Sequence, residues 1–422
     1  MHFIRKKYIA CVICLLPLLS CISTSQGTAR FCKIEHSYSI ADPQFQRAIH
    51  GLLGEAMVPG NKVETLINGD RIFPRMLEAI RGAKESINFE TFIYWSGTIG
   101  QEMADALSER ARNGVEVRVI LDWFGSHEMN SGLIREMRSA GVSVIKYNPL
   151  HWYELSRLNN RTHRKLLIVD GRIGFTGGVG IADEWRGNAQ DQNHWRDNHY
   201  RIVGPAVLML QGAFAEHWLK AVGEVMDDKK FFPALVDSGT MYAKVQKSSP
   251  YDGIWNTELL YRLAITAATH DIRIETAYFI PDDLIETALV DAAGRGVRIK
   301  IIVPGPYIDK RFVREASREG WAPLLKAGIE IYEYQPTMFH CKMLVVDDSW
   351  VTVGSTNFDN RSFHLSDEAN LNVSDPQFAQ EQTDIFNADL KESRRIMLNE
   401  LRRQHWYRKL IGNFYGIFRL EM

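Results

Sequence analysis

The sequence is poor in cysteine. It has 5 cysteines in 422 residues, and Cys11, Cys14 and Cys21 all lie close to the N-terminus. Only Cys32 and Cys341 remain for the rest of the chain, which excludes a framework of disulfides and leaves no Cys-x-x-Cys pair for a metal there. Cys341 lies within a predicted strand between two polar residues. Alternation turns its side chain to the other face, so we expect a small buried apolar group.

An excess of charge is also missing. The formal net charge is -1 and the isoelectric point is near 6.9. Proteins that bind nucleic acids usually carry a clear basic excess, so we expect no nucleic-acid partner, and an anionic ligand must meet a local site. The 45% hydrophobic and 24% charged residues are those of an ordinary globular protein. The chain is long enough for two domains with sizeable cores.

The N-terminus lacks an apolar run long enough for a permanent membrane span. The run from Ile9 to Leu19 is about half of the ~20 residues that a spanning helix needs. Basic residues precede it, so we predict that residues 1–20 are a secretory signal. The sequence Leu-Leu-Ser-Cys ending at Cys21 resembles the lipobox of bacterial lipoproteins, and we expect lipidation of Cys21. A plain cleaved signal and an uncleaved anchor remain alternatives.

The rest of the chain is made of two similar halves. Segments of the first half return in the second half in the same order: 86–91 as 271–276, 112–119 as 294–301, 140–142 as 327–329, and 163–177 as 340–354. Helical periods alternate with apolar strands in each half, which predicts an α/β sandwich with a parallel or mixed sheet. The predicted parts are a tether at 21–62, a first half at 63–225, a linker at 226–255 and a second half at 256–422.

The second half is expected to end in an amphipathic helix, from about Gln377 to Leu420. Its last residues mix basic and aromatic side chains: Arg402, Arg403, Trp406, Tyr407, Arg408, Lys409, Phe414, Tyr415 and Phe418. This pattern suits a membrane interface. It also suits a helix that packs on its own domain and leaves its charged face in water, and the sequence leaves both interpretations open.

A His-x-Lys-x4-Asp signature occurs once in each half. The two copies are His163, Lys165 and Asp170, and His340, Lys342 and Asp347. Each copy is followed, seven residues after its aspartate, by a glycine, and chance matches to the signature are expected only about 0.05 times in such a chain. On a strand, residues two apart share a face, so each histidine points the same way as its lysine. The aspartate comes seven positions after the histidine and therefore points to the opposite face of the strand. We expect it to support the fold.

Paired imidazole and ammonium groups suit attack on a phosphodiester. One imidazole serves as nucleophile, the other protonates the leaving alkoxide, and two lysines balance the phosphoryl oxygens. The lysines do the work of a metal, so we expect no metal and no other cofactor. Small residues downstream, Gly177 and Gly178 in one half and Ser355 and Asn357 in the other, are candidates to bind the phosphate.

A neutral imidazole needs a partner on its far nitrogen that fixes its tautomer. Asp197 and Glu368 each open a polar-apolar run after the glycine element of their half, so the repeat makes them equivalent. We predict that these two carboxylates orient the histidines. Structural salt bridges within the sheet are the alternative role for strand carboxylates.

The duplicated motif resembles that of the phospholipase D superfamily. From about Val63 to the C-terminus, the order of elements resembles bacterial cardiolipin synthases and their phospholipase D-like relatives. The resemblance implies two α/β sandwich halves packed around one shared active site, and a phosphatidyl-histidine intermediate that an alcohol or water resolves. It makes His163 and His340 the nucleophile and the general acid/base, with His163 as the nucleophile. Lys165 and Lys342 are then the phosphate ligands.

The chain departs from the family pattern at one position. After Gly177 and Gly178 the family usually has an asparagine, whereas this chain has Gly180, so the first half lacks an amide donor that Asn357 supplies in the second. The two halves are therefore unequal. This is compatible with a division of labour between them.

The leading functional hypothesis is a phosphatidyltransferase of cardiolipin synthase type that acts on phosphatidylglycerol at a membrane surface of the bacterial cell envelope. A phospholipase D that uses water is the near alternative, because both reactions share one intermediate. An exported nuclease of the same superfamily and a non-catalytic membrane scaffold are more distant alternatives. The sequence does not determine the oligomeric state.

Overall fold

The computed structural model describes residues 34–149, 160–250 and 256–402. The expected signal, Cys21 and the aromatic end of the expected C-terminal helix lie outside the described residues. Among the helices that are described, none combines the length and apolarity that a membrane span requires. The two halves lie in one compact unit, 36–422, and the following concerns this unit.

The first half, 43–222, begins with one helix and then alternates strands with helices. Its elements are α2 (Pro43–Leu53), β1 (Val58–Ile67), α3 (Gly69–Gly82), β2 (Ser86–Thr91), α4 (Thr98–Arg112), β3 (Glu116–Asp122), α5 (Ser131–Ser139), β4 (Ser143–Tyr147), β5 (Arg161–Thr162), β6 (Leu166–Val169), β7 (Ile173–Gly177), the 3-10 helix η2 (Asp183–Trp185), β8 (Asn198–Val203) and α6 (Val207–Val222).

The second half, 241–402, repeats this order with additional short elements. Its elements are β9 (Met241–Ser248), α7 (Asn256–Ala267), β10 (Asp271–Thr276), β11 (Phe279–Ile280), α8 (Asp283–Gly294), β12 (Arg298–Pro304), α9 (Arg311–Glu319), α10 (Trp321–Lys326), β13 (Glu330–Tyr334), β14 (Lys342–Val346), β15 (Trp350–Gly354), β16 (Phe358–Asp359), α11 (Asn360–His364), β17 (Ser366–Ser374), α12 (Pro376–Lys391), β18 (Ser393–Arg395) and α13 (Leu398–Arg402).

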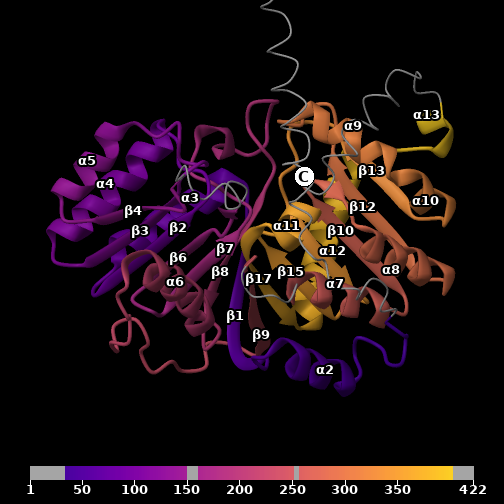
Figure 1. Ribbon diagram of the computed structural model, residues 1–422, viewed down its shortest axis with the longest axis horizontal. Helices are drawn as coiled ribbons and strands as arrows, with labels where there is room; N and C mark the ends of the chain where they lie inside the picture. The colour runs from indigo at the N-terminus through magenta and orange to yellow at the C-terminus, as the bar shows by residue number, and fades with distance from the viewer. Residues whose placement is uncertain (1–33, 150–159, 251–255, 403–422) are drawn as a thin grey trace, which may run out of the picture. The chain divides into compact units, whose positions relative to one another are not determined.

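One mixed sheet runs through both halves. Its order is β18-β13-β12-β10-β14-β15-β17-β9-β1-β8-β7-β6-β2-β3-β4, with β5 attached to β17 (Figure 1). Read outward from the centre, β1-β8-β7-β6-β2-β3-β4 corresponds strand by strand to β9-β17-β15-β14-β10-β12-β13. In both halves the outer strands of the repeat pair in parallel and the inner strands antiparallel, and the edge strand β18 pairs antiparallel with β13. The predicted α/β class with mixed sheets is confirmed.

The central strands differ from the sequence expectation. The range expected to link the halves contains β9, which is the counterpart of β1 and pairs with it antiparallel. The range expected to be a tether contains α2 and the start of β1, and Phe45 of α2 is fully buried against Trp350 at a ring distance of 5.0 Å. Both segments carry polar residues in a weak pattern because they are short or partly exposed, so the periodicity that marks the other elements is lost.

Helices cover both faces of the sheet. On one face of the first half, α3, α4 and α5 bury a cluster that includes Ile80, Leu107 and Met137. On another, a second cluster takes residues from both halves, among them Phe214 of α6 and Phe378 of α12. The halves therefore share a hydrophobic core as well as a sheet, and burial of this apolar area opposes their separation.

Candidate active site

Each histidine of the repeated motif lies on a short segment that docks against the other half. The His163 backbone N–H donates to the Asp367 carbonyl at 2.8 Å, beside the parallel pairing of β5 with β17. The His340 N–H donates to the Arg196 carbonyl, also at 2.8 Å, where Phe339 bridges Arg196 in parallel. These exchanged backbone contacts bring the two motifs to the boundary between the halves.

The motif segments are less regular than the sequence suggested. Residues 163–165 lie between β5 and β6 and not within one continuous strand, and His340 lies just before β14. The strand pairing changes here, because β5 pairs with the second half whereas β6 pairs with β2 and β7 of its own half. Cys341, as expected, is fully buried in the shared core.

The two candidate carboxylates are exchanged between the halves. Nδ1 of His163 lies 2.9 Å from Oε1 of Glu368, and Nδ1 of His340 lies 2.7 Å from Oδ2 of Asp197. Both carboxylates are fully buried. Each Nδ1 thus faces a carboxylate of the other half, which leaves Nε2 as the ring nitrogen not committed to that contact.

Further groups hold each carboxylate in place. Asp197 accepts from the indole Nε1 of Trp185 at 2.9 Å and from the backbone of Asn198 at 2.8 Å. Glu368 accepts from the Ser355 hydroxyl at 2.5 Å. Burial alone would raise the pKa of both carboxyl groups. The neighbouring histidine and lysine outweigh this effect in each case and keep the pKa below its usual value.

The motif lysines bind the backbone of their own motif. Nζ of Lys165 donates to the His163 carbonyl at 2.7 Å, and Nζ of Lys342 donates to the His340 carbonyl at 2.6 Å. Burial lowers the pKa of Lys165 to about 7, and the Lys342 ammonium contributes to this lowering. Burial also lowers the pKa of Lys342. Two buried ammonium groups close to both rings make this place favourable for an anion.

Burial also keeps both imidazoles neutral. It lowers the pKa of His163 to about 4, an effect that the nearby Glu368 opposes and Lys165 reinforces. It lowers the pKa of His340 to about 3, with Lys342 as the next cause. Near pH 7 the site therefore contains two neutral imidazoles, and a proton on Nδ1 of either ring would point toward its carboxylate.

A cavity of about 620 Å³ opens in front of both rings. It is lined by polar and charged groups, His127, Arg161, His163, Lys165, Glu184, Asp309, Lys310, His340, Asn357, Asp359, Arg361, Ser362 and Ser366, and by an apolar wall that includes Phe92, Ile93, Trp95, Phe124, Trp185, Trp195, Tyr278, Ile280, Phe312 and Val313. Such a wall beside a few convergent polar groups is typical of a site for an amphipathic ligand.

The motif aspartates lie at the opposite ends of their strands from the histidines and bind backbone amides. Asp170 accepts from the N–H groups of 84–86, at distances from 2.7 to 3.1 Å. Asp347 accepts from those of 269–271 at 2.7 to 2.9 Å. Each carboxylate thus stabilises the turn that precedes the neighbouring strand, which is β2 for Asp170 and β10 for Asp347.

The glycine and serine candidates contact the residues that support the histidines and do not line the cavity. A Cβ on Gly178 would lie 2.2 Å from the Asp197 carboxylate, and one on Gly177 would lie 2.6 Å from the His199 ring. Ser355 is bonded to Glu368. Among the four candidates for phosphate binding, Asn357 lines the cavity, and its side-chain oxygen accepts no hydrogen bond from the described residues.

Sequence reasoning missed the residues that shape the cavity. Trp185 and Trp195 both pack against the His340 ring, at 5.2 and 5.6 Å, and Phe92 packs against the His163 ring at 5.2 Å. Arg161 lies over the Phe124 ring at 4.7 Å. Arg161 lies two residues before His163, and this proximity was the available signal. Trp185 ends the short 3-10 helix η2 and Trp195 lies in a loop, so neither tryptophan belongs to a periodic pattern.

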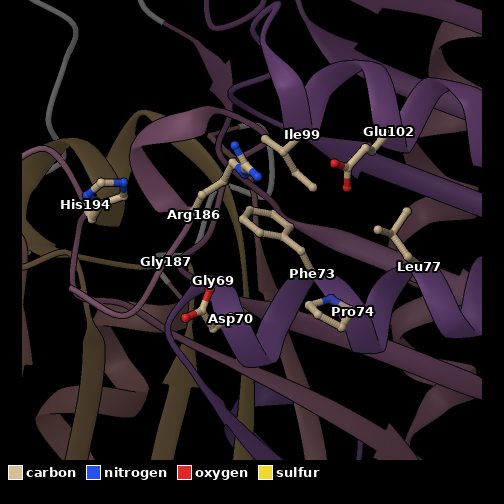
Figure 2. A pocket seen from close by; sticks show the side chains of 10 residues that line it. All are labelled: Gly69, Asp70, Phe73, Pro74, Leu77, Ile99, Glu102, Arg186, Gly187 and His194. Atoms are coloured by element: carbon tan, nitrogen blue, oxygen red, sulfur yellow. The ribbon is translucent and has the colours of Figure 1, made fainter. Parts of the chain in front are cut away.

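A second cavity, of about 410 Å³, lies on the first half beside α3. Figure 2 shows Asp70, Phe73 and Leu77 of α3 on one side of it, with Arg186 and Glu102 above them. Its lining mixes charges of both signs and includes none of the motif residues. The arrangement gives no indication of a reacting group.

Two histidines that face one cavity, each beside a motif lysine, on a duplicated α/β fold define a phosphodiester transferase of phospholipase D type. The chain matches the family model described as "Cardiolipin synthase, PLD-like domain" at residues 76–194 and 261–390. Cardiolipin synthase 2 of Bacillus anthracis is 35% identical over 359 residues, 84% of this chain and 70% of that protein. Cardiolipin synthase of Halalkalibacterium halodurans is 32% identical over 395 residues, 90% of this chain and 78% of that protein. The chain belongs to the cardiolipin synthase family, as the sequence resemblance indicated.

A solved structure supports the same fold assignment. The crystal structure of phosphatidylserine synthase from Haemophilus influenzae superimposes with a TM-score of 0.66, covers 89% of this chain and 97% of its own, and is 15% identical in sequence. At this level of identity the likeness concerns the fold alone.

Proposed function

We propose that this enzyme transfers a phosphatidyl group from one phosphatidylglycerol molecule to another and releases glycerol. The observation that carries the proposal is the pair of neutral histidines, each beside its lysine and a carboxylate of the other half, in front of one cavity. The names of the relatives, cardiolipin synthases of two bacteria, support the choice of substrate.

In the first step, Nε2 of His163 attacks the phosphorus of the donor lipid. A P–N bond forms, the P–O bond to the terminal glycerol breaks, and His340 gives a proton to the leaving alkoxide. The product is free glycerol and a phosphatidyl group on His163. Glu368, on the far side of the His163 ring, stabilises the positive charge that the ring acquires.

In the second step, the hydroxyl group of a second phosphatidylglycerol gives its proton to His340 and attacks the phosphorus. The new P–O bond completes cardiolipin, and the P–N bond to His163 breaks. His340 thus gains a proton that replaces the one it gave to glycerol. One cycle consumes two lipids and returns the site to its initial state.

The first step needs a protonated His340, and the substrate helps to supply it. The two ammonium groups of Lys165 and Lys342 oppose a proton on this ring. A bound phosphodiester anion offsets their positive field and so raises the pKa of His340 in the complex. The same lysines, with the amide of Asn357, stabilise the charge on the phosphoryl oxygens during the transfer.

The cavity favours a lipid as the acceptor. Besides Lys165 it presents the cations Arg161, Arg361 and Lys310, together with the carboxyl groups of Glu184, Asp309 and Asp359, so positive groups other than the motif lysine are available for a second phosphate. An acceptor lipid carries a second phosphodiester and apolar chains, which match these cations and the aromatic wall. We further propose that the enzyme works at a membrane of the cell envelope, to which a lipid on Cys21 anchors it.

The test is product analysis with vesicles of phosphatidylglycerol. We expect cardiolipin and glycerol in equal amounts, and a phosphatidyl-enzyme after a rapid acid quench that is absent from His163→Ala. His194→Gln, which changes an exposed histidine paired with Asp191, is the matched control and should retain full turnover. Phosphatidic acid without cardiolipin would establish the hydrolase alternative and refute the proposal.

A further inference from the structure

A cluster of possible metal ligands lies apart from the histidine pair, where α7, α8 and α11 meet. Glu258 is in the first turn of α7, Asp282 is the N-cap of α8, and His364 is the last residue of α11. One ligand atom from each of the three lies within 4.8 Å of the others. None of the three is among the residues that line the cavity of the active site.

The Glu258 carboxylate is buried without the hydrogen bonds that such a group needs. Only 1% of the residue is exposed. Within the described part of the chain, neither oxygen accepts a hydrogen bond, and the nearest cationic groups are Arg262 at 3.6 Å from Oε1 and His364 at 3.7 Å from Oε2. These two ion pairs offset the cost of burying the carboxylate only in part, because neither contact is a hydrogen bond.

The distances around the His364 ring fit a shared cation better than direct contacts. Nε2 lies 3.7 Å from Oε2 of Glu258 and 3.6 Å from Oδ2 of Asp282, beyond hydrogen-bond length in both cases. Zinc binds nitrogen and carboxylate oxygen at about 2.0–2.2 Å, so neighbouring ligands of a tetrahedral ion are roughly 3.3–3.6 Å apart.

The other oxygen of Asp282 fixes the geometry of the cluster. Oδ1 accepts the N–H groups of Leu284 and Ile285 at 2.9 and 2.8 Å, which holds the carboxylate at the start of α8 and directs Oδ2 toward His364. A ligand that is positioned by a second hydrogen bond is the usual arrangement in metal sites. The donor set of one imidazole and two carboxylates suits zinc.

We propose that Glu258, Asp282 and His364 bind a structural Zn²⁺ ion that joins α7, α8 and α11. The ion would neutralise two carboxylates and satisfy the buried Glu258. It would also fix one wall of the active-site cavity, because Arg361 and Ser362 of α11 line that cavity. The proposal does not depend on the identity of the substrate.

The test uses the full chain without a histidine tag, stripped with EDTA and titrated with Zn²⁺ against a chromophoric chelator. We expect one tight equivalent and a higher melting temperature in Zn²⁺ than in EDTA. Glu258→Gln and His364→Gln should each weaken binding by about tenfold or more. His194→Gln, at a surface His–Asp pair with a contact of 2.8 Å, should leave it unchanged.

Two further measurements distinguish metal binding at this cluster from metal binding by the histidines of the cavity, and from loss of binding because a variant fails to fold. The double variant His163→Ala/His340→Ala should retain the tight equivalent while losing lipid turnover. Wild-type protein loaded with Co²⁺ should show the intense visible bands of a four-coordinate ion. A wild-type chain that takes up no tight equivalent, or an equivalent that persists in both Glu258→Gln and His364→Gln, would overturn the proposal.

Discussion

Nδ1 of His163 lies 2.9 Å from Oε1 of Glu368, although 205 positions separate the two residues. The counterpart contact joins His340 to Asp197 at 2.7 Å. Each half thus provides the carboxylate for the histidine of the other half. Neither half alone contains a motif histidine together with the carboxylate that contacts it, so this arrangement exists only when both halves are folded and docked.

We expect Glu368→Gln to lower the rate of cardiolipin formation by about 10²- to 10⁴-fold. The amide removes the negative charge that holds the Nδ1 proton and stabilises the charged ring. The measurement is turnover per molecule of folded enzyme, with a pH profile, and Glu368→Asp should recover part of the rate. Asp191→Asn, which changes an exposed His–Asp pair with a contact of 2.8 Å, serves as control. A Glu368→Gln rate within threefold of wild type would contradict this positioning role.

Activity should fall as the pH rises above about 7. Burial lowers the pKa of Lys165 to about 7, so the ammonium loses its proton through this range and the phosphodiester loses a positive partner. The expected slope of kcat/KM is up to about tenfold per pH unit. An arginine at this position keeps its charge over this pH range. The residual activity of Lys165→Arg should therefore show no fall above pH 7. A wild-type profile that is flat from pH 6 to pH 9 would refute the assignment.

Asp347→Asn should destabilise the fold. The carboxylate accepts the N–H groups of 269–271, and its loss weakens charge-assisted hydrogen bonds at the start of β10. We expect the free energy of unfolding to fall by about 2–4 kcal/mol in denaturant titrations. Asparagine tolerates the left-handed backbone at this position, where φ is 50°.

The neighbouring Asp348 provides the control for this experiment. It also has a left-handed backbone, with φ at 47°, but its carboxylate pairs with Arg273 and accepts from the Thr383 hydroxyl on a partly exposed surface. Asp348→Asn should therefore cost less than about 1 kcal/mol. Equal losses in the two variants would show that backbone conformation, and not the amide contacts, determines the effect.

Gly180→Asn should not restore a symmetric site. A Cβ at Gly180 would lie 2.9 Å from Cβ of Ile93 and 3.2 Å from the Trp185 ring, so the space that an asparagine needs is filled. We expect a lower melting temperature and a several-fold loss of turnover, because Trp185 also holds Asp197. Gly212→Asn is the control, since within the described residues, apart from the adjoining backbone of its own helix, no atom lies within 4 Å of its added Cβ. Higher activity of Gly180→Asn would contradict this explanation.

Local pattern made the duplicated motif and the α/β class predictable. Identical spacing in the two halves identified the repeat, and alternating helix and strand patterns predicted the mixed sheet, which is confirmed. Parity along the chain predicted that each aspartate points away from its histidine, although 163–165 and 340–341 do not lie within a continuous strand. These features depend on residues that are close in sequence, so the sequence expresses them directly.

Only the tertiary structure decided which groups meet. Periodicity cannot say that β9 pairs with β1, or that Glu368 faces His163 and not the histidine of its own half, because such contacts depend on which sheet edges dock. It likewise cannot say that Ser355 bonds to Glu368 or that Ile93 fills the space beside Gly180. The sequence by itself determined the chemical groups of the site, whereas the packing of the two halves determined their partners, since that packing brings together residues far apart in the chain.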